Sequence, residues 1–201
     1  MKRILGLDAS SKTIGIAIID YDDNQLSLHD CFYYKPPQKG NIFERMSKVR
    51  IYIQKLIDTY KPDDVSLEDI VLHMKGHSTA KTITTLAVLN RTVGTAVFDK
   101  HGKAPYLYNV MRIRHAIKNN KDLPPKEEIP NLVADHLGLS FPYLTNSKGE
   151  VVKKKNGDFK EENFDIADGI ACALCHVFKD REGVADQLQV KKKKKRKKKK
   201  V

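Results

Sequence analysis

Four acidic residues stand where short apolar segments end or where a helix is expected to begin. Asp8 closes an apolar run near the start of the chain, and Glu68 closes a second run further along it. Asp165 and Asp168 are spaced so that both lie on one face of a helical turn. Carboxylates gathered at one place repel one another unless cations lie between them, and such hard oxygen ligands suit Mg²⁺ or Mn²⁺.

The chemistry that such a cluster supports is phosphodiester hydrolysis with two bound metal ions. Two ions about 4 Å apart activate a water molecule and stabilise the leaving 3′ oxygen, so no Ser, Cys or His nucleophile is needed. Each acid taken alone has another explanation, as a helix cap or, for Asp8, as a turn residue. Asp69 follows Glu68 directly, and we rank it second because successive strand side chains point to opposite faces.

The elements that position these acids begin with two strands folded back on each other within Arg3–Asp20. Ile4–Asp8 predicts the first strand, Thr13–Ile19 the second, and Ala9–Lys12 supplies a turn of small residues. An almost fully apolar strand is covered on both faces, which places the first strand centrally in its sheet. Leu26–Tyr34 predicts a third strand, completing an antiparallel meander.

A helix over Ile42–Tyr60 separates the meander from the strand Val65–Glu68. This order allows a helical crossover to a parallel strand, which would bring Glu68 beside Asp8. The remaining expected elements are a helix over Thr79–Asp99, a strand over Ala104–Tyr108, a short basic helix over Asn109–Asn119, a helix over Pro125–Leu137, a lid or hairpin within Ser140–Glu162, and a last helix over Asn163–Lys179 with Asn163 as its N-cap.

The positive charge is concentrated at the C-terminus. The chain has 37 Lys and Arg against 25 Asp and Glu, but Lys191–Lys200 is an unbroken cationic run whose removal leaves 27 against 25. Like charges in a row cannot form a core, so we expect one folded domain over residues 1–183 and a disordered basic tail over 184–201. The tail suits a non-specific anchor on nucleic acid, or alternatively a solubility tail.

The cysteine content and the hydropathy pattern restrict the cellular context. The three cysteines are sparse, and the sequence has neither a long apolar run nor a signal-peptide pattern, which predicts a cytoplasmic, non-secreted protein without a membrane segment. Cys172-Ala-Leu-Cys175-His176 is similar to half of a zinc site. Because the segment is apolar and helical and no second pair of ligands has suitable spacing, buried cysteines are the better interpretation.

The order of elements and the four acids resemble the RuvC family of Holliday-junction resolvases, which have a ribonuclease H-like fold. The motifs that carry the resemblance are GLDASSKTIGIAIID, VSLED and FDIADGIACALCH, and it covers about residues 1–180. It implies an α/β fold with a mixed five-stranded sheet flanked by helices, and a homodimer that cuts branched DNA at four-way junctions to leave 5′-phosphate ends. It also implies two Mg²⁺ or Mn²⁺ ions per active site, held by Asp8, Glu68, Asp165 and Asp168.

By the same resemblance, the basic residues near the scissile phosphate map to Arg114 and Lys126, with Lys118 and Lys121 competing for this role. The chain departs from the family at Asp69, where the family has Gln, and at 71–73, where some members carry an aromatic wedge. The additional basic segments would suit a phage, viral or organellar source. The expected DNA-binding residues are Arg112, Arg114, Lys118, Lys126, Lys153, Lys154 and Lys155, and the helix Thr79–Asp99 is either a dimer contact or part of the core.

Three other interpretations share some of these features. The same acids would serve another ribonuclease H-like nuclease that acts on RNA–DNA hybrids, flaps or other branched DNA. The pattern Asp-x-Ser-Ser-x-x-x-Gly also resembles the phosphate loop of actin-like ATPases, but the chain is too short for their duplicated domain. A non-catalytic DNA-binding scaffold would keep the fold, although four retained acids argue against it because their repulsion is costly without metal.

Overall fold

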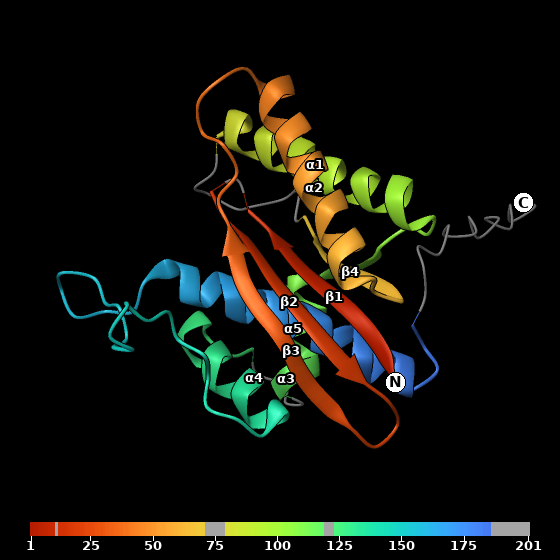
Figure 1. The fold of residues 1–201 in the computed structure, drawn as a ribbon, viewed down its shortest axis with the longest axis vertical. Coiled ribbons are helices and arrows are strands. Elements are labelled where there is room, and N and C mark those ends of the chain that lie inside the picture. Colours follow the sequence, from red (N-terminus) through yellow and green to blue (C-terminus); the bar gives the residue numbers. More distant parts are fainter. Residues whose placement is uncertain (11, 71–78, 119–122, 186–201) are drawn as a thin grey trace, which may run out of the picture.

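The computed structural model describes residues 1–10, 12–70, 79–118 and 123–185, and Figure 1 shows a mixed sheet with helices on both faces. The strand order is β3-β2-β1-β4-β5, in which the first three strands are antiparallel and the last two run parallel to β1. The expected fold class is confirmed. The strands are β1 (Lys2–Ala9), β2 (Ile14–Tyr21), β3 (Leu26–Tyr34), β4 (Asp64–Asp69) and β5 (Tyr106–Asn109).

Strand β1 occupies the centre of the sheet, as its apolar sequence predicts. The register pairs Asp8 with Gly15 of β2 on one side, and Leu7 with Leu67 of β4 on the other. Because β1 and β4 are parallel and in register, Asp8 and Glu68 follow the last pair at the same edge of the sheet. The acids of these two strands are therefore neighbours because of backbone pairing.

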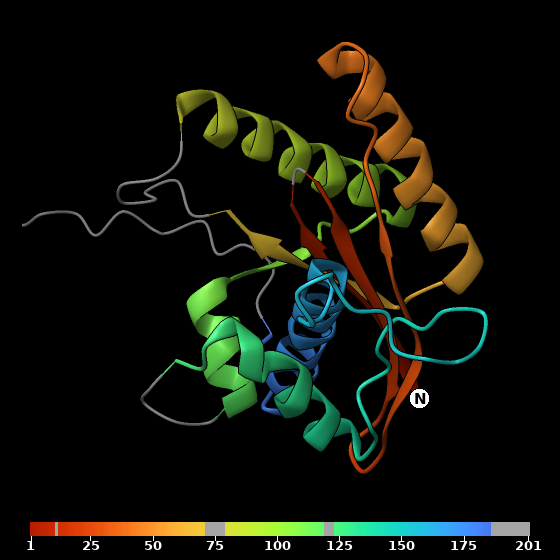
Figure 2. The ribbon, with the colours of Figure 1, turned by 90° about the vertical axis from the view of Figure 1, so that its left-hand side faces the viewer.

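The helices form two layers that enclose the sheet, as Figure 2 shows. Leu5 and Leu7 of β1 pack toward one layer, whereas Ile4 packs toward the other, following the two-residue period of a strand. The first layer contains α1 (Ile42–Tyr60) and α2 (Ala80–His101), and the second contains α3 (Val110–Lys118), a 3₁₀ turn (Lys126–Glu128), α4 (Ile129–Leu137) and α5 (Glu161–Arg181).

Helix α5 lies unusually close to β1 and β2 because glycines replace side chains at the crossing. A Cβ atom added to Gly15 would lie 1.7 Å from the backbone oxygen of Asp165, and one added to Gly6 would lie 2.4 Å from that of Gly169. Neither position can accept a side chain without moving the helix. This close packing fixes the first turns of α5 over the ends of β1 and β2.

Three expected element boundaries differ from the structure. Helix α5 begins at Glu161, so Asn163 is not its N-cap; it is buried inside the helix and its Oδ1 accepts a hydrogen bond from the Leu144 amide at 2.8 Å. The helix expected from Pro125 begins with the 3₁₀ turn and becomes α-helical only at Ile129. Strand β5 begins at Tyr106 because Pro105 has no N–H to donate to the ladder.

Residues 140–160, which we call the arm, connect α4 to α5 and project beside the N-terminal end of α5 (cyan in Figure 1). The arm turns back twice, and isolated antiparallel bridges join Thr145 to Val151 and Lys153 to Phe159. The two turns use positive φ angles of 80° at Gly149 and 89° at Gly157. The arm thus has the hairpin character expected of this segment, with a minimum of regular strand.

None of the helices in the described ranges is long and apolar enough to cross a membrane. Cys172 and Cys175 are buried free thiols on α5, as expected for packing residues. Several predictions concern residues outside the described ranges and therefore stay predictions: the basic tail beyond residue 185, Lys121, and the segment at 71–73 where an aromatic wedge would stand.

Candidate active site

Three of the four predicted acids come together at one edge of the sheet. Carboxylate oxygens of Asp8, Asp165 and Asp168 all lie within 4.8 Å of one another. Asp8 is held by the central strand, and the other two project from the second turn of α5, where their spacing places them on one face. The position of both elements is fixed by the glycine-mediated packing, so this cluster is built on rigid backbone.

Glu68 adjoins this cluster from the end of β4 without belonging to the group of three. Burial raises the pKa of Glu68 to about 7, and the neighbouring Asp168 carboxylate contributes to the rise. The Asn90 side chain donates a hydrogen bond of 2.8 Å to the backbone oxygen of Glu68 and fixes the end of the strand. The fourth acid therefore interacts electrostatically with Asp8 and Asp168.

The remaining acids are also shifted toward their neutral forms. Burial, followed by the charges of Glu68, Asp168 and Asp165, raises the pKa of Asp8 well above its usual value. Burial also raises the pKa of Asp165 and of Asp168, although the Lys126 ammonium opposes both shifts. Carboxylates in this situation are stabilised by any cation that enters the cluster.

Lys126 supplies one such cation from the 3₁₀ turn that precedes α4. Its Nζ lies 3.3 Å from Oδ2 of Asp168 and 3.5 Å from Oδ1 of Asp165. Burial alone would lower the pKa of Lys126, but the carboxylates of Asp168, Asp165 and Asp8 outweigh it and raise this pKa above the usual value. The donor set thus already accommodates a positive charge.

The other predicted basic residues of α3 lie on different sides of that helix. Arg114 lies close enough to the acids that its charge lowers the pKa of Glu68 and of Asp168. Its Nη1 donates to the Pro124 carbonyl at 3.4 Å, and its buried Nε has no hydrogen-bond partner among the residues that the structure describes. Lys118 instead forms an ion pair with Glu128 at 3.0 Å.

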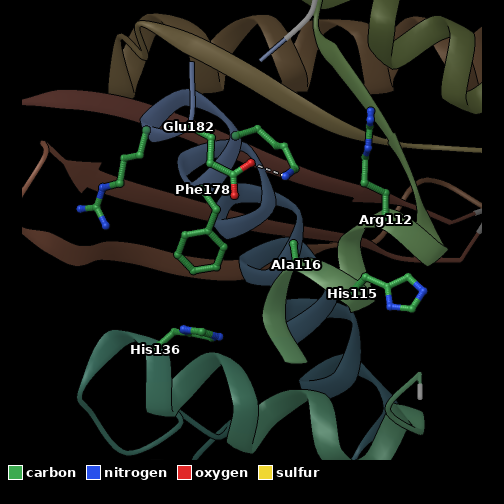
Figure 3. Close-up of a pocket in the computed structure, with 8 residues that line it drawn as sticks. Arg112, His115, Ala116, His136, Phe178 and Glu182 are labelled. Atoms are coloured by element: carbon green, nitrogen blue, oxygen red, sulfur yellow. Dashed lines mark hydrogen bonds and ion pairs between the residues drawn. The ribbon is translucent and has the colours of Figure 1, made fainter. Parts of the chain in front are cut away.

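Arg112 lines a groove of about 750 Å³ between α3, α4 and the C-terminal end of α5, shown in Figure 3. In the middle of this groove the rings of His136 and Phe178 pack 5.0 Å apart, and His136 donates a hydrogen bond to the Ile117 carbonyl. The Arg112 side chain points away from these rings. The groove lies at the opposite end of α5 from the acid cluster.

Of the three predicted lysines of the arm, Lys154 lines cavities that Asp165 also lines. Lys154 forms an ion pair of 3.0 Å with Glu161, and the ammonium of Lys153 lies 5.2 Å from the ring centre of Phe159. Lys155 is exposed. A cavity of about 600 Å³ beside Asp165 adds three basic residues that the sequence reasoning missed, Lys12, Lys35 and Lys160. Only the position of Lys12 in the turn after Asp8 could have indicated one of them.

Asp69 does not join the site, in agreement with its lower rank. Its carboxylate forms an ion pair with Arg91 of α2 at 3.0 Å. Asp69 is therefore an acid next to Glu68 in the sequence, but the charge of Asp69 is already compensated by Arg91.

The site combines a central strand that ends in a carboxylate, a parallel strand that ends in another, and a helix that adds two more. This combination defines the class of ribonuclease H-like nucleases. Residues 4–140 match the family described as crossover junction endodeoxyribonuclease RuvC. This match covers more than half of the chain, which therefore belongs to the RuvC family.

Relatives and solved structures agree with this assignment. The crossover junction endodeoxyribonuclease RuvC of Finegoldia magna is 24% identical over 178 residues, covering 88% of this chain and 93% of that protein. The T. thermophilus RuvC in complex with Holliday junction substrate superposes with a TM-score of 0.68 at 19% identity, covering 94% of this chain and 100% of that one. A fowlpox virus resolvase, also solved with Holliday junction DNA, has a TM-score of 0.51 at 13% identity, covering 85% of this chain and 95% of that one. The structural similarities show the shared fold.

Proposed function

We propose that this chain is a divalent-metal-dependent, structure-selective endodeoxyribonuclease that resolves four-way DNA junctions and leaves 5′-phosphate ends. The observation that carries the proposal is the convergence of Asp8, Asp165 and Asp168, with Glu68 beside them, in a member of the crossover junction endodeoxyribonuclease family. The junction DNA named for the T. thermophilus and fowlpox virus structures supports branched DNA as the substrate.

The four acids fit a pair of divalent cations. Their oxygens are hard ligands, their pKa values are raised by burial and mutual repulsion, and one ammonium already lies among them. Asp8, Glu68, Asp165 and Asp168 would hold two Mg²⁺ or Mn²⁺ ions, which when bound activate the attacking water and stabilise the leaving oxygen.

The protein's own residues position the phosphate and limit its freedom. Arg114 and Lys126 approach the acid cluster from α3 and the 3₁₀ turn, where their charges would bind the oxygens of the scissile phosphate. Lys126 reaches this position on a flexible side chain, so it can exchange its carboxylate contacts for a phosphate contact. The rigid ends of β1 and α5 hold the acids, which avoids reorganisation during the reaction.

Resolution of a junction requires two symmetrically placed cuts, for which we propose a two-fold homodimer. Helix α2 is the proposed contact because it presents apolar side chains to solvent: Val88 is 39% exposed and Phe98 is 56% exposed. The lysines Lys153, Lys154 and Lys155, together with the basic tail, would add phosphate contacts that depend on salt concentration. A bacterial cytoplasm, or that of a phage-infected cell, would supply both the DNA and the divalent ions.

The experiment that tests this function compares synthetic four-way junctions with duplex, flap and RNA–DNA hybrid substrates, each with Mg²⁺ or Mn²⁺. Wild type is expected to make metal-dependent paired cuts in the junction, and Asp8→Asn to make none. Asp69→Asn is the matched control because its charge is paired with Arg91 outside the cluster. Cutting of hybrids or flaps alone would assign the chain to another ribonuclease H-like activity, and tight junction binding without cutting would favour a scaffold.

A further inference from the structure

The arm forms one wall of a second cavity beside the acid cluster, with a volume of about 710 Å³. Lys126 and Asp165 line this cavity and form an ion pair at the acid cluster, so the cavity adjoins the cluster. The cavity has the size of sites that hold small organic ligands. Most of the arm lies beyond residues 4–140, the range matched by the family model.

Three aromatic side chains are among the residues that line this cavity. Tyr143 and Phe159 stack with ring centres 4.3 Å apart and an angle of 15° between the rings, and Phe164 of α5 also lines the space. All three side chains are partly exposed. Aromatic side chains bind unpaired nucleobases by stacking, with little dependence on base identity.

The cavity also offers polar groups suited to the edge of a base. Asn131 of α4, an exposed residue, lines the cavity. A carboxamide both donates and accepts, so it can contact the edge of any base. Lys154 lines this cavity and also the cavity of about 600 Å³ that contains Lys12, Lys35 and Lys160.

We propose that this cavity takes a single unstacked nucleobase from the cleaved strand, next to the scissile phosphate. The proposal rests on the proposed function, since it places that phosphate at the acid cluster. A phosphate bound by Lys126 beside Asp165 would place its adjacent nucleotide at the mouth of the cavity, because both residues line it. Extraction of a base costs least where pairing is already interrupted, as at the crossing of a four-way junction. The arm would thus hold the substrate by one base as well as by phosphate contacts.

The test uses junctions that lack one base, with the abasic site placed in turn at each position near the cleavage point. In wild type, loss of the base at one position is expected to slow single-turnover cleavage about tenfold, the size expected for loss of one stacking contact. Phe159→Leu, which removes the flat ring, should slow cleavage of the intact junction about tenfold and show no further loss on that abasic junction. Phe43→Leu is the control, because Phe43 is 83% exposed on α1.

Asn131→Ala provides a second variant, because Asn131 is an exposed residue of α4 outside the arm. It should slow the intact junction about threefold and leave the critical abasic junction unaffected. Equal slowing of intact and abasic junctions by both variants, or no position-specific loss in wild type, would overturn the proposal while leaving junction cleavage intact.

If wild type cut no junction, the proposed function would fail, and the cavity would still be testable by binding. A 2-aminopurine base is quenched while it stacks on neighbouring bases and becomes brighter when it leaves the stack. A fluorescence increase on protein binding at one position that is lost in Phe159→Leu supports the cavity, and the absence of a position-specific increase contradicts it.

Discussion

The pKa values of aspartates shift in opposite directions at the two ends of helix α5. At the N-terminal end, burial raises the pKa of Asp165 and of Asp168, and the neighbouring acids Asp8 and Glu68 are shifted upward as well. At the C-terminal end, hydrogen bonds from Lys2 at 2.7 Å and from Tyr21 at 3.0 Å outweigh partial burial and lower the pKa of Asp180.

This contrast separates the acids that stabilise the fold from those that await a cation. Asp180 has its charge compensated by the protein, so its contacts complete the docking of α5 against β1 and β2. In the described part of the chain, Lys126 and Arg114 are the cations that compensate the acids at the other end. Such uncompensated charge is retained at a cost to stability, which is typical of functional sites.

The largest effect is expected from Asp8→Asn. Loss of this carboxylate should reduce junction cleavage at least about 10³-fold, because electrostatic stabilisation of the transition state by bound metal is worth several kcal/mol. The apo protein should be at least as stable as wild type, since Asn removes a repelled charge. Single-turnover cleavage and thermal melts without metal check both expectations, and cleavage retained within tenfold would contradict the role of Asp8.

A substitution that disturbs the backbone packing at the N-terminal end of α5 should reduce junction cleavage nearly as strongly. Gly15→Ala places a Cβ atom in the space taken by the Asp165 backbone, so α5 must shift away from Asp8. We expect about 10²-fold slower cleavage and a loss of about 1–3 kcal/mol in unfolding free energy. Gly102→Ala is the control: it introduces strain at a φ of 79° but has open space around it, so stability should fall without a change in cleavage.

The raised pKa of Glu68 predicts how stability depends on pH. The folded state binds this proton up to about pH 7, whereas the unfolded chain releases it near pH 4.5. The folded state therefore binds more protons between these values, and this contribution makes the unfolding free energy fall as pH rises through the window, by about 2–3 kcal/mol. Denaturation curves from pH 4.5 to 8 should show this slope, and Glu68→Gln or saturating Mg²⁺ should flatten it. A slope unchanged in Glu68→Gln would show that other groups cause it.

The smallest effect is expected at the C-terminal end of α5. Asp180→Asn should weaken the contacts with Lys2 and Tyr21 and lower stability by about 1 kcal/mol, since the ion pair is partly exposed. Because the four acids of the candidate site all lie at the other end of the helix, junction cleavage should remain within twofold of wild type. A large loss of cleavage in this variant would show that the two ends are coupled.

The sequence predicted the central strand and the gathering of the acids because both depend on simple patterns. An apolar run that ends in Asp8 indicates a covered strand, and the spacing of Asp165 and Asp168 indicates one helix face. The predicted start of α5 at Asn163 was wrong. The Asn163 side chain accepts a hydrogen bond from the Leu144 amide instead of capping the helix, and this contact exists only in the tertiary structure.

The basic residues were harder to predict than the acids. Exposed lysines have no periodic signature, so nothing marked Lys35 or Lys160 as neighbours of Asp165. The different positions of Arg112 and Arg114 follow from their separation on α3, since residues two apart do not share a helix face. The position of Lys126 among the carboxylates depends on how the 3₁₀ turn docks against α5, for which the sequence has no local signal.

The close packing of α5 on the first hairpin has a consequence for the timing of activity during protein synthesis. Asp8 is synthesised well before Asp165 and Asp168, which lie far along the chain on α5. A nascent chain can form the early strands while it still lacks half of the acids, and contacts between such distant segments form late in folding. The enzyme is therefore expected to remain unable to cut DNA until α5 has been synthesised and has packed on the first hairpin.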